Sequence, residues 1–115
     1  MRALADRHIA ESLERLHNNL SHAWTLESLA REVGLSRAGF ARRFKELVGM
    51  SMFDYLTQLR VQRAKELLSD TGLSLYAVAN HIGYESDLAF TRTFKKRTGV
   101  TPTAYRKSQA EMLEN

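Results

Sequence analysis

The sequence predicts an all-α fold of seven helices, arranged as two helix-turn-helix subdomains that a long central helix bridges. Three observations predict this fold class. Apolar residues recur at helical spacing along almost the whole chain, and runs of β-branched residues are absent. A pattern of short helix, turn and second helix at residues 26–56 returns at residues 75–106. No low-complexity linker separates the two copies, so the connecting stretch is expected to be helical as well.

The two copies agree in detail. The offset between them is 49 residues up to Gly34 and Gly83, and 50 residues from Ser36 and Ser86 onward, so the second turn is one residue longer. The matching residues of the first copy are Leu26, Leu29, Ala30, Val33, Phe40, Arg42, Phe44, Lys45, Gly49, Ser51 and Tyr55. In the same order, those of the second copy are Leu75, Val78, Ala79, Ile82, Phe90, Arg92, Phe94, Lys95, Gly99, Thr101 and Tyr105. Each copy has an arginine midway along its second helix, which is typical of a DNA-binding protein with two reading heads.

Length and composition limit the classes of protein. A chain of 115 residues with 43% hydrophobic residues can bury one core, or two small cores that share an element. Cysteine is absent, which excludes disulfides, thiolate zinc sites and a cysteine nucleophile. No apolar run approaches the roughly 18 residues of a membrane span and no signal pattern begins the chain, so we expect a cytoplasmic protein without a membrane partner. The net charge of +4 favours an anionic partner.

Residues 1–50 are expected to form the first subdomain. Its first helix runs over about residues 5–20, where four apolar residues form one stripe. Thr25 caps a short second helix that ends at Gly34, where glycine adopts a left-handed backbone at little cost. The third helix, over about residues 36–48, is the predicted recognition helix of this subdomain.

A long fourth helix over residues 51–69 is expected to link the subdomains. Ser51 caps its start, and Asp54 at the third helical position completes a capping-box-like pair. The helix is expected to continue to about Leu68 through the apolar residues Phe53, Leu56, Leu59, Ala64 and Leu67. The three residues Asp70, Thr71 and Gly72 are expected to end it.

Residues 70–115 are expected to form the second subdomain. Ser74 caps its short first helix, and its recognition helix spans about residues 86–97. A last helix has Pro102 in its first turn, runs to about Gln109 and then frays.

A helix that enters the major groove must be packed on one face and accessible on the other. With the Phe-x-x-x-Phe pair of each recognition helix buried and 100° per residue, the opposite face carries Arg42 or Arg92. Arginine offers two donors that match O6 and N7 of guanine, so these two residues are the first choices for base contacts. The other residues on these faces are Ala38, Ala41 and Lys45 in the first copy and Leu88, Thr91 and Lys95 in the second.

Several other residues near the groove are small or apolar. They fit against thymine methyl groups but donate no hydrogen bond, and they are Ala38, Ala41, Leu88 and Ala89. Asp87 accepts hydrogen bonds, which suits cytosine or a neighbouring side chain. Phosphate contacts are expected from hydroxyl groups, cations and free amides at the helix starts, and these set orientation rather than sequence preference. The side chains are Ser36, Arg37, Arg43, Lys45, Ser86, Thr91, Thr93, Lys95, Lys96 and Arg106.

Three other classes of protein fit the sequence less well. A helical protein-interaction module with basic faces needs no repeated arginine. An RNA-binding or nucleoid protein is disfavoured because no stacking aromatics are apparent on the groove faces. An enzyme has no support, because no Ser-His-acid constellation, glycine-rich phosphate loop or metal-ligand spacing among the four histidines occurs. We therefore expect neither a cofactor nor a metal.

The second copy has the most specific pattern in the chain. Its characteristic residues are Gly83, Tyr84, Glu85, Ser86, Phe90, Arg92, Phe94, Lys95, Lys96, Gly99, Thr101, Pro102, Tyr105 and Arg106. This stretch resembles the signature of the DNA-binding domain of the AraC/XylS family of bacterial transcription regulators. The resemblance covers about residues 7–107 and includes the first copy. The first copy departs from the family pattern at Met52, where the family usually has the proline that Pro102 supplies in the second copy.

The resemblance implies two homeodomain-like three-helix units that bind two successive major-groove segments of a double-stranded promoter site. In such proteins the base-contacting positions correspond to Arg37, Ala38, Ala41, Arg42, Asp87, Leu88, Ala89 and Arg92 here. It also implies contact with RNA polymerase, and a sensor domain on the amino-terminal side that is missing from this chain. We therefore expect a monomeric domain excised from a larger regulator, with a stand-alone regulator as the alternative. Activation and repression both stay open.

Overall fold

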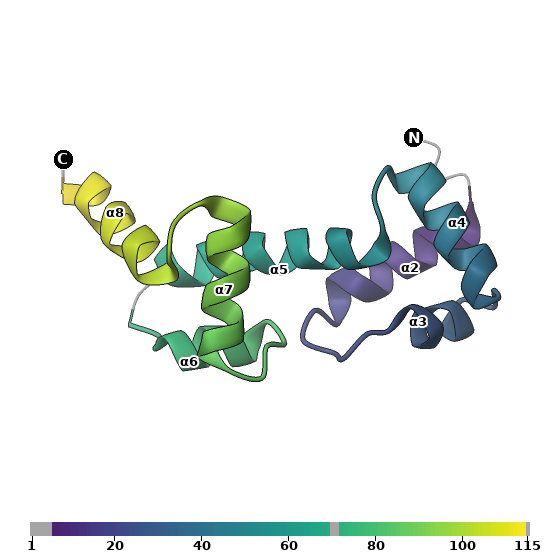
Figure 1. Cartoon of the computed structure of the whole chain (residues 1–115), viewed down its shortest axis with the longest axis horizontal. Helices are drawn as coiled ribbons and strands as arrows, with labels where there is room; N and C mark the ends of the chain where they lie inside the picture. Colours follow the sequence, from purple (N-terminus) through teal and green to yellow (C-terminus); the bar gives the residue numbers. More distant parts are fainter. Residues whose placement is uncertain (1–5, 70–71, 115) are drawn as a thin grey trace. The chain divides into compact units, whose positions relative to one another are not determined.

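The computed structural model describes residues 6–69 and 72–114, and these form seven helices and no strand (Figure 1). The helices are α2 (Arg7–Asn18), α3 (Leu26–Glu32), α4 (Arg37–Val48), α5 (Met52–Ser69), α6 (Leu75–His81), α7 (Asp87–Thr98) and α8 (Pro102–Glu114). The predicted all-α fold with seven helices is confirmed. The predicted helix start at residue 5 and the predicted helix breakers Asp70 and Thr71 lie outside the described residues.

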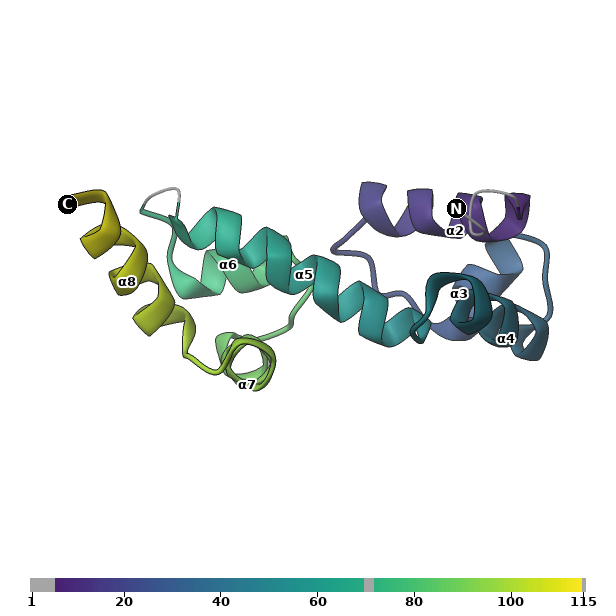
Figure 2. The ribbon, with the colours of Figure 1, turned by 90° about the horizontal axis from the view of Figure 1, so that it is seen from above.

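The chain packs as two compact units, Met1–Leu59 and Arg60–Asn115, so their boundary lies within α5. Figure 2 shows α5 as one continuous helix. The first half of α5 belongs to the core of the first unit, and its second half belongs to the second unit. The buried residues of α5 are Met52, Leu56, Val61, Ala64, Leu67 and Leu68. A division into domains at residues 50 and 70, with a separate linker helix, stays a prediction.

The side chains that cap the helices lie where the sequence predicted them. Ser36 Oγ accepts a hydrogen bond from the Gly39 amide at 3.1 Å, which satisfies one of the unpaired donors at the start of α4. Ser86 Oγ does the same for α7, also at 3.1 Å. Both recognition helices end at a glycine with a left-handed backbone, at φ +94° for Gly49 and +88° for Gly99. The two helices therefore begin and end in the same way.

Each unit is built around the same aromatic cluster. In the first unit the ring of Phe44 meets the rings of Phe40 and Tyr55 edge-on, each pair with 5.7 Å between centroids. The second unit repeats this arrangement at 5.7 and 5.6 Å with Phe90, Phe94 and Tyr105. Edge-to-face pairs of this kind add about 0.5–1.5 kcal/mol beyond the burial of their surface. The predicted inward positions of the phenylalanines are confirmed.

The start of α5 differs from the sequence prediction. Phe53 is 52% exposed, whereas Met52 before it is only 2% exposed and belongs to the first core. Met52 has the same register as Pro102, which is fully buried at the start of α8. In both helices the apolar residue that directly follows the cap therefore anchors the first turn. This residue is methionine in α5 and proline in α8.

The last helix is longer than predicted. α8 continues to Glu114 rather than ending near Gln109. Ala110, Met112 and Leu113 are good helix formers, and no glycine or proline interrupts them. The exposed fraction of Leu113 reaches 82%, so helix propensity rather than burial extends α8 at this end.

Candidate nucleic-acid interface

α4 and α7 are each packed on one face and accessible on the other. The inward phenylalanines of both helices are at most 1% exposed. Figure 2 views α7 nearly along its axis. The predicted contact residues that are exposed are Ser36, Arg37, Ala38, Arg42, Arg43, Lys45, Asp87, Leu88, Ala89, Arg92, Lys95 and Lys96. Those that are half-buried are Ala41, Ser86, Thr91, Thr93 and Arg106. Each unit thus presents the outer face of its recognition helix to solvent.

Arg42 and Arg92 have the same situation in the two units. Both are exposed, and neither side chain makes a hydrogen bond or an ion pair with another residue in the ranges 6–69 and 72–114. A guanidinium without an internal partner keeps all its donors for a ligand. Both side chains are therefore available for bidentate contact with guanine.

Arg43 is held differently from Arg42 beside it. Its Nη1 lies 3.5 Å from Oδ2 of Asp6, which caps α2 through the amides of His8 and Ile9. An exposed ion pair of this kind contributes at most about 1 kcal/mol. A phosphate could therefore replace Asp6 as the partner of Arg43, and the predicted phosphate contact of Arg43 stays a prediction.

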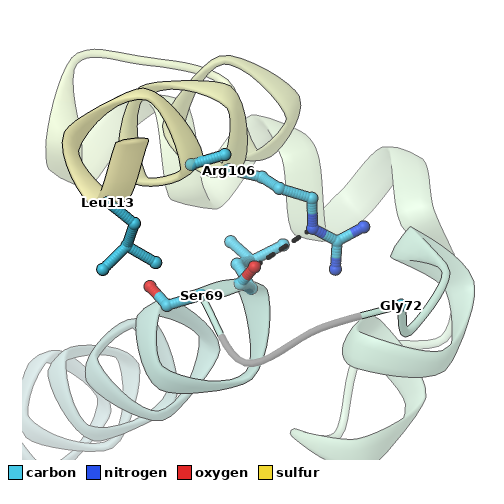
Figure 3. Close-up of a pocket in the computed structure, with 6 residues that line it drawn as sticks. Ser69, Gly72, Arg106 and Leu113 are labelled. Atoms are coloured by element: carbon cyan, nitrogen blue, oxygen red, sulfur yellow. Dashed lines mark hydrogen bonds between the residues drawn. The ribbon is translucent and has the colours of Figure 1, made fainter. Parts of the chain in front are cut away.

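Arg106 has a structural contact that the sequence analysis missed. Its Nε donates a hydrogen bond to the carbonyl oxygen of Leu68 at 3.1 Å, which ties α8 to the last turn of α5 (Figure 3). Its Nη2 is buried without a protein partner, beside a cavity of about 210 Å³ that Ser69 and Leu113 also line. The predicted phosphate contact of Arg106 stays a prediction.

The repeat offered a signal for the inward position of Arg106. At an offset of 50 residues Arg106 corresponds to Leu56, which is only 2% exposed in the first core. A register that is buried in one unit is expected to face inward in the other, whatever residue type occupies it.

The serine hydroxyls at the two helix starts remain able to donate. Ser36 and Ser86 each accept a hydrogen bond from an amide of their own helix, which uses the oxygen but not the hydroxyl proton. The start of a helix also carries partial positive charge. Each recognition helix therefore begins with a site that suits a phosphate oxygen.

The two recognition helices end with different charge. The last turn of α7 contains Lys95, Lys96 and Arg97, whereas the last turn of α4 contains Lys45 followed by Glu46. Cations at this end also interact favourably with the helix dipole. The second unit therefore concentrates more positive charge at the end of its recognition helix.

The described part of the chain offers neither a cluster of metal ligands nor a membrane-spanning helix. Among residues 6–69 and 72–114, no three His, Asp or Glu side chains come together in a group that could hold a metal ion. In the same ranges, no helix has the length and apolar character that a membrane span requires.

Comparison with known proteins gives a consistent result. A family model described as a helix-turn-helix domain matches residues 29–108. A putative AraC-like transcription regulator of Streptomyces antibioticus is 38% identical over 104 residues, which are 90% of this chain and 34% of that protein. The RCS-specific HTH-type transcriptional activator RclR of Escherichia coli K12 is 40% identical over 85 residues, covering 74% of this chain and 30% of that protein. The chain thus spans about a third of the length of these relatives.

Solved structures agree with the sequence matches. The C-terminal domain of AraT, a response regulator from Geobacillus stearothermophilus, matches with a TM-score of 0.87 and 31% identity over 90% of this chain and 86% of that one. The DNA-binding domain of AdpA, solved in complex with a target DNA, matches with a TM-score of 0.82 and 32% identity over 86% of this chain and 89% of that one.

Proposed function

This chain belongs to the helix-turn-helix family of AraC-type transcription regulators, and we propose that it reads two successive major-groove segments of promoter DNA, one with α4 and one with α7. The observation that carries this proposal is the repeated arginine. Arg42 and Arg92 stand at the same register on the accessible faces of two helices whose opposite faces are buried. A merely solvated basic face would not need the same residue at the same place twice.

The division of roles follows from side-chain chemistry. Arg42 and Arg92 carry base recognition, because a guanidinium matches the two acceptors of guanine. The two base-reading sets are completed by Ala41 and by the residues at the starts of the two helices, which are Arg37, Ala38, Asp87, Leu88 and Ala89. The serines, threonines and remaining cations of the predicted phosphate set fix the position of each helix on the backbone.

The wider setting is also a proposal. Because the curated relatives are about three times as long as this chain, we take the chain to work as the DNA-binding part of a larger cytoplasmic regulator. By itself the domain is expected to be monomeric on one asymmetric site. Contact with RNA polymerase is supported only by membership of a family of transcription regulators.

Unbiased selection of bound duplexes from a random pool tests the proposal. We expect enrichment of one asymmetric site that spans roughly two helical turns, with two conserved segments separated by about one turn. The affinity for this site should fall steeply with salt, because several phosphates are neutralised. Enrichment of no sequence at all, or binding that is insensitive to salt, would contradict the proposed function.

A further inference from the structure

The internal repeat extends further than a constant sequence offset shows. α2 buries Ile9, Ser12 and Leu16, and the second half of α5 buries Val61, Ala64 and Leu68. Both sets have spacings of three and then four residues, so the offset between them is a constant 52. This offset differs from the offset of 49 residues that relates α3 to α6, because the segment that follows α2 and the segment that follows α5 differ in length. The second half of α5 therefore has the same place in the second unit as α2 has in the first unit.

This register pairs His8 with Arg60, and in the first unit His8 contacts the turn between α3 and α4. Its Nδ1 donates a hydrogen bond to the carbonyl oxygen of Val33 at 2.6 Å. Val33 is the last residue before Gly34, whose backbone is left-handed at φ +77°. The carbonyls at the end of a helix lack partners within the helix, so His8 satisfies one of them.

In the second unit, Arg60 contacts the equivalent turn with different chemistry. Its guanidinium carbon lies 5.6 Å from the centroid of the Tyr84 ring, and Tyr84 directly follows Gly83 of the turn. The Tyr84 ring lies 6.0 Å from the ring of Phe90 in α7. Burial lowers the pKa of Arg60, and its interaction with Tyr84 acts in the opposite direction.

The two turns that these residues contact have the same backbone hydrogen bonds. Gly34 donates to the Arg31 carbonyl at 3.2 Å, and Leu35 donates to the Ala30 carbonyl at 3.0 Å. The matching bonds of Gly83 and Tyr84 measure 3.3 and 2.9 Å. This pattern is the Schellman motif, which fixes the direction in which the chain leaves a helix. Here it fixes where the recognition helix begins.

We propose that His8 and Arg60 are positioning residues, which brace the turn of each helix-turn-helix unit from its first helix and so set the placement of α4 and α7. The bracing itself stands on the contacts above, and its effect on DNA binding rests on the proposed function. An open cavity of about 490 Å³ lies beside His8 and is lined by Arg31, Glu32 and Gly34 among others. Water can therefore reach the Val33 carbonyl when His8 is replaced, so we expect effects of several-fold rather than complete loss.

Amide hydrogen exchange in the free protein tests the bracing. Removing one hydrogen bond of ordinary strength should speed exchange at the amide of Leu35 about fivefold in His8→Ala, with no change at Tyr84. In His8→Asn the amide nitrogen takes the place of Nδ1, so exchange should return toward the wild-type rate. In His8→Gln the amide nitrogen lies one bond further out, so this matched control should behave like His8→Ala.

The second unit supplies the reciprocal test. Arg60→Met keeps an apolar stem but removes the guanidinium, and it should speed exchange at Tyr84 while leaving Leu35 unchanged. Arg60→Lys keeps a charge but not the planar group, so it should rescue only in part. If the two amides respond equally to both substitutions, or if His8→Asn and His8→Gln behave alike, the proposed bracing is wrong.

DNA binding tests the positioning role. On the site selected from the random pool, one segment is scrambled at a time, so that only the other segment is read specifically. His8→Ala should weaken binding about fivefold where the first unit's segment is intact and change little where only the second unit's segment is intact. Altered amide exchange with unaltered DNA binding would overturn the positioning role. Failure to select any site would count against the proposed function, and the exchange experiment would still decide the bracing.

Discussion

The two units share a scaffold and differ on the face that they present. The caps, the left-handed glycines and the aromatic cluster repeat with nearly identical distances. The accessible faces share an arginine and a lysine, which are Arg42 and Lys45 in the first unit. They differ where Ala38 and Ala41 of the first unit correspond to Leu88, which is 58% exposed, and Thr91 of the second. Packing therefore dictates the shared positions, and the differing positions are where an asymmetric DNA site would be specified.

The largest expected effect separates scaffold from surface within one unit. Phe44→Ala should lower the free energy of unfolding by about 3–5 kcal/mol, because it removes a fully buried ring from a small core. Phe94→Ala should cost the same in the second unit. Phe53→Ala is the matched control and should change stability by less than about 1 kcal/mol, because Phe53 is half exposed. Denaturant unfolding measures all three, and a Phe53→Ala loss as large as that of Phe44→Ala would refute the assignment of the core.

The next effect concerns the two arginines. Arg42→Ala and Arg92→Ala should each lose about 1–3 kcal/mol of binding free energy on the selected site and much less on random duplexes. Lys96→Ala should weaken binding to all sequences alike. It should also reduce the salt slope, which is the slope of the logarithm of the association constant against the logarithm of the salt concentration, by about 1 in magnitude. Titration of selected and random duplexes at several salt concentrations measures both. Equal losses on the two kinds of duplex for the arginine variants would mean that they contact only phosphate.

A smaller effect tests the inward register of Arg106. Arg106→Ala should lower the free energy of unfolding by about 1–2 kcal/mol, because the Leu68 carbonyl loses its donor. Lys107→Ala, at the exposed neighbour, is the control and should stay within about 0.5 kcal/mol of the wild type. The same variant decides the predicted phosphate contact: a salt slope reduced by about 1 would support it, and an unchanged slope would remove Arg106 from the contact set.

The smallest effect lies in the alkaline range and belongs to the first unit. Tyr55 shares a 2.8 Å hydrogen bond with His17 Nε2, and burial raises the pKa of Tyr55 above its ordinary value of 10.0. The unfolded chain therefore loses this proton first as the pH rises. The contribution of Tyr55 to stability is complete below pH 10 and declines as the pH rises through the folded pKa.

Tyr55→Phe should therefore remove part of the stability loss above pH 10. Urea unfolding between pH 8 and pH 11 measures this difference. Tyr76→Phe, at a tyrosine that is 62% exposed, serves as the control. A decline that is the same in the wild type and in Tyr55→Phe would show that this tyrosine is not the group responsible.

Most of the fold followed from local signals. A serine or threonine before an apolar stripe and a glycine after it located the starts and ends of α3, α4, α6 and α7, because both signals act through the nearest backbone groups. The aromatic positions followed from helical periodicity. The burial of Met52 rather than Phe53 did not follow from periodicity. Two adjacent apolar residues fit the same helical pattern, and only packing against other helices decides which of them is buried.

The missed contacts all depend on tertiary placement. The predicted role of Arg106 rested on its charge, whereas its register relative to Leu56 determines where the side chain lies. His8 and Arg60 were missed because segments of different length follow their helices, so no single offset aligns them. The accessible face of each recognition helix was predictable, since it is the complement of a buried stripe.

The most direct test of the account is to repeat the random-pool selection with Arg42→Ala and with Arg92→Ala beside the wild type. If each arginine reads one base in its own groove segment, each variant should lose preference at one position, and the two positions should lie about one helical turn apart. The rest of the selected site should stay unchanged in both. Loss at the same position in the two variants, or uniform weakening across the whole site, would contradict the claim that the repeated arginines read two separate segments.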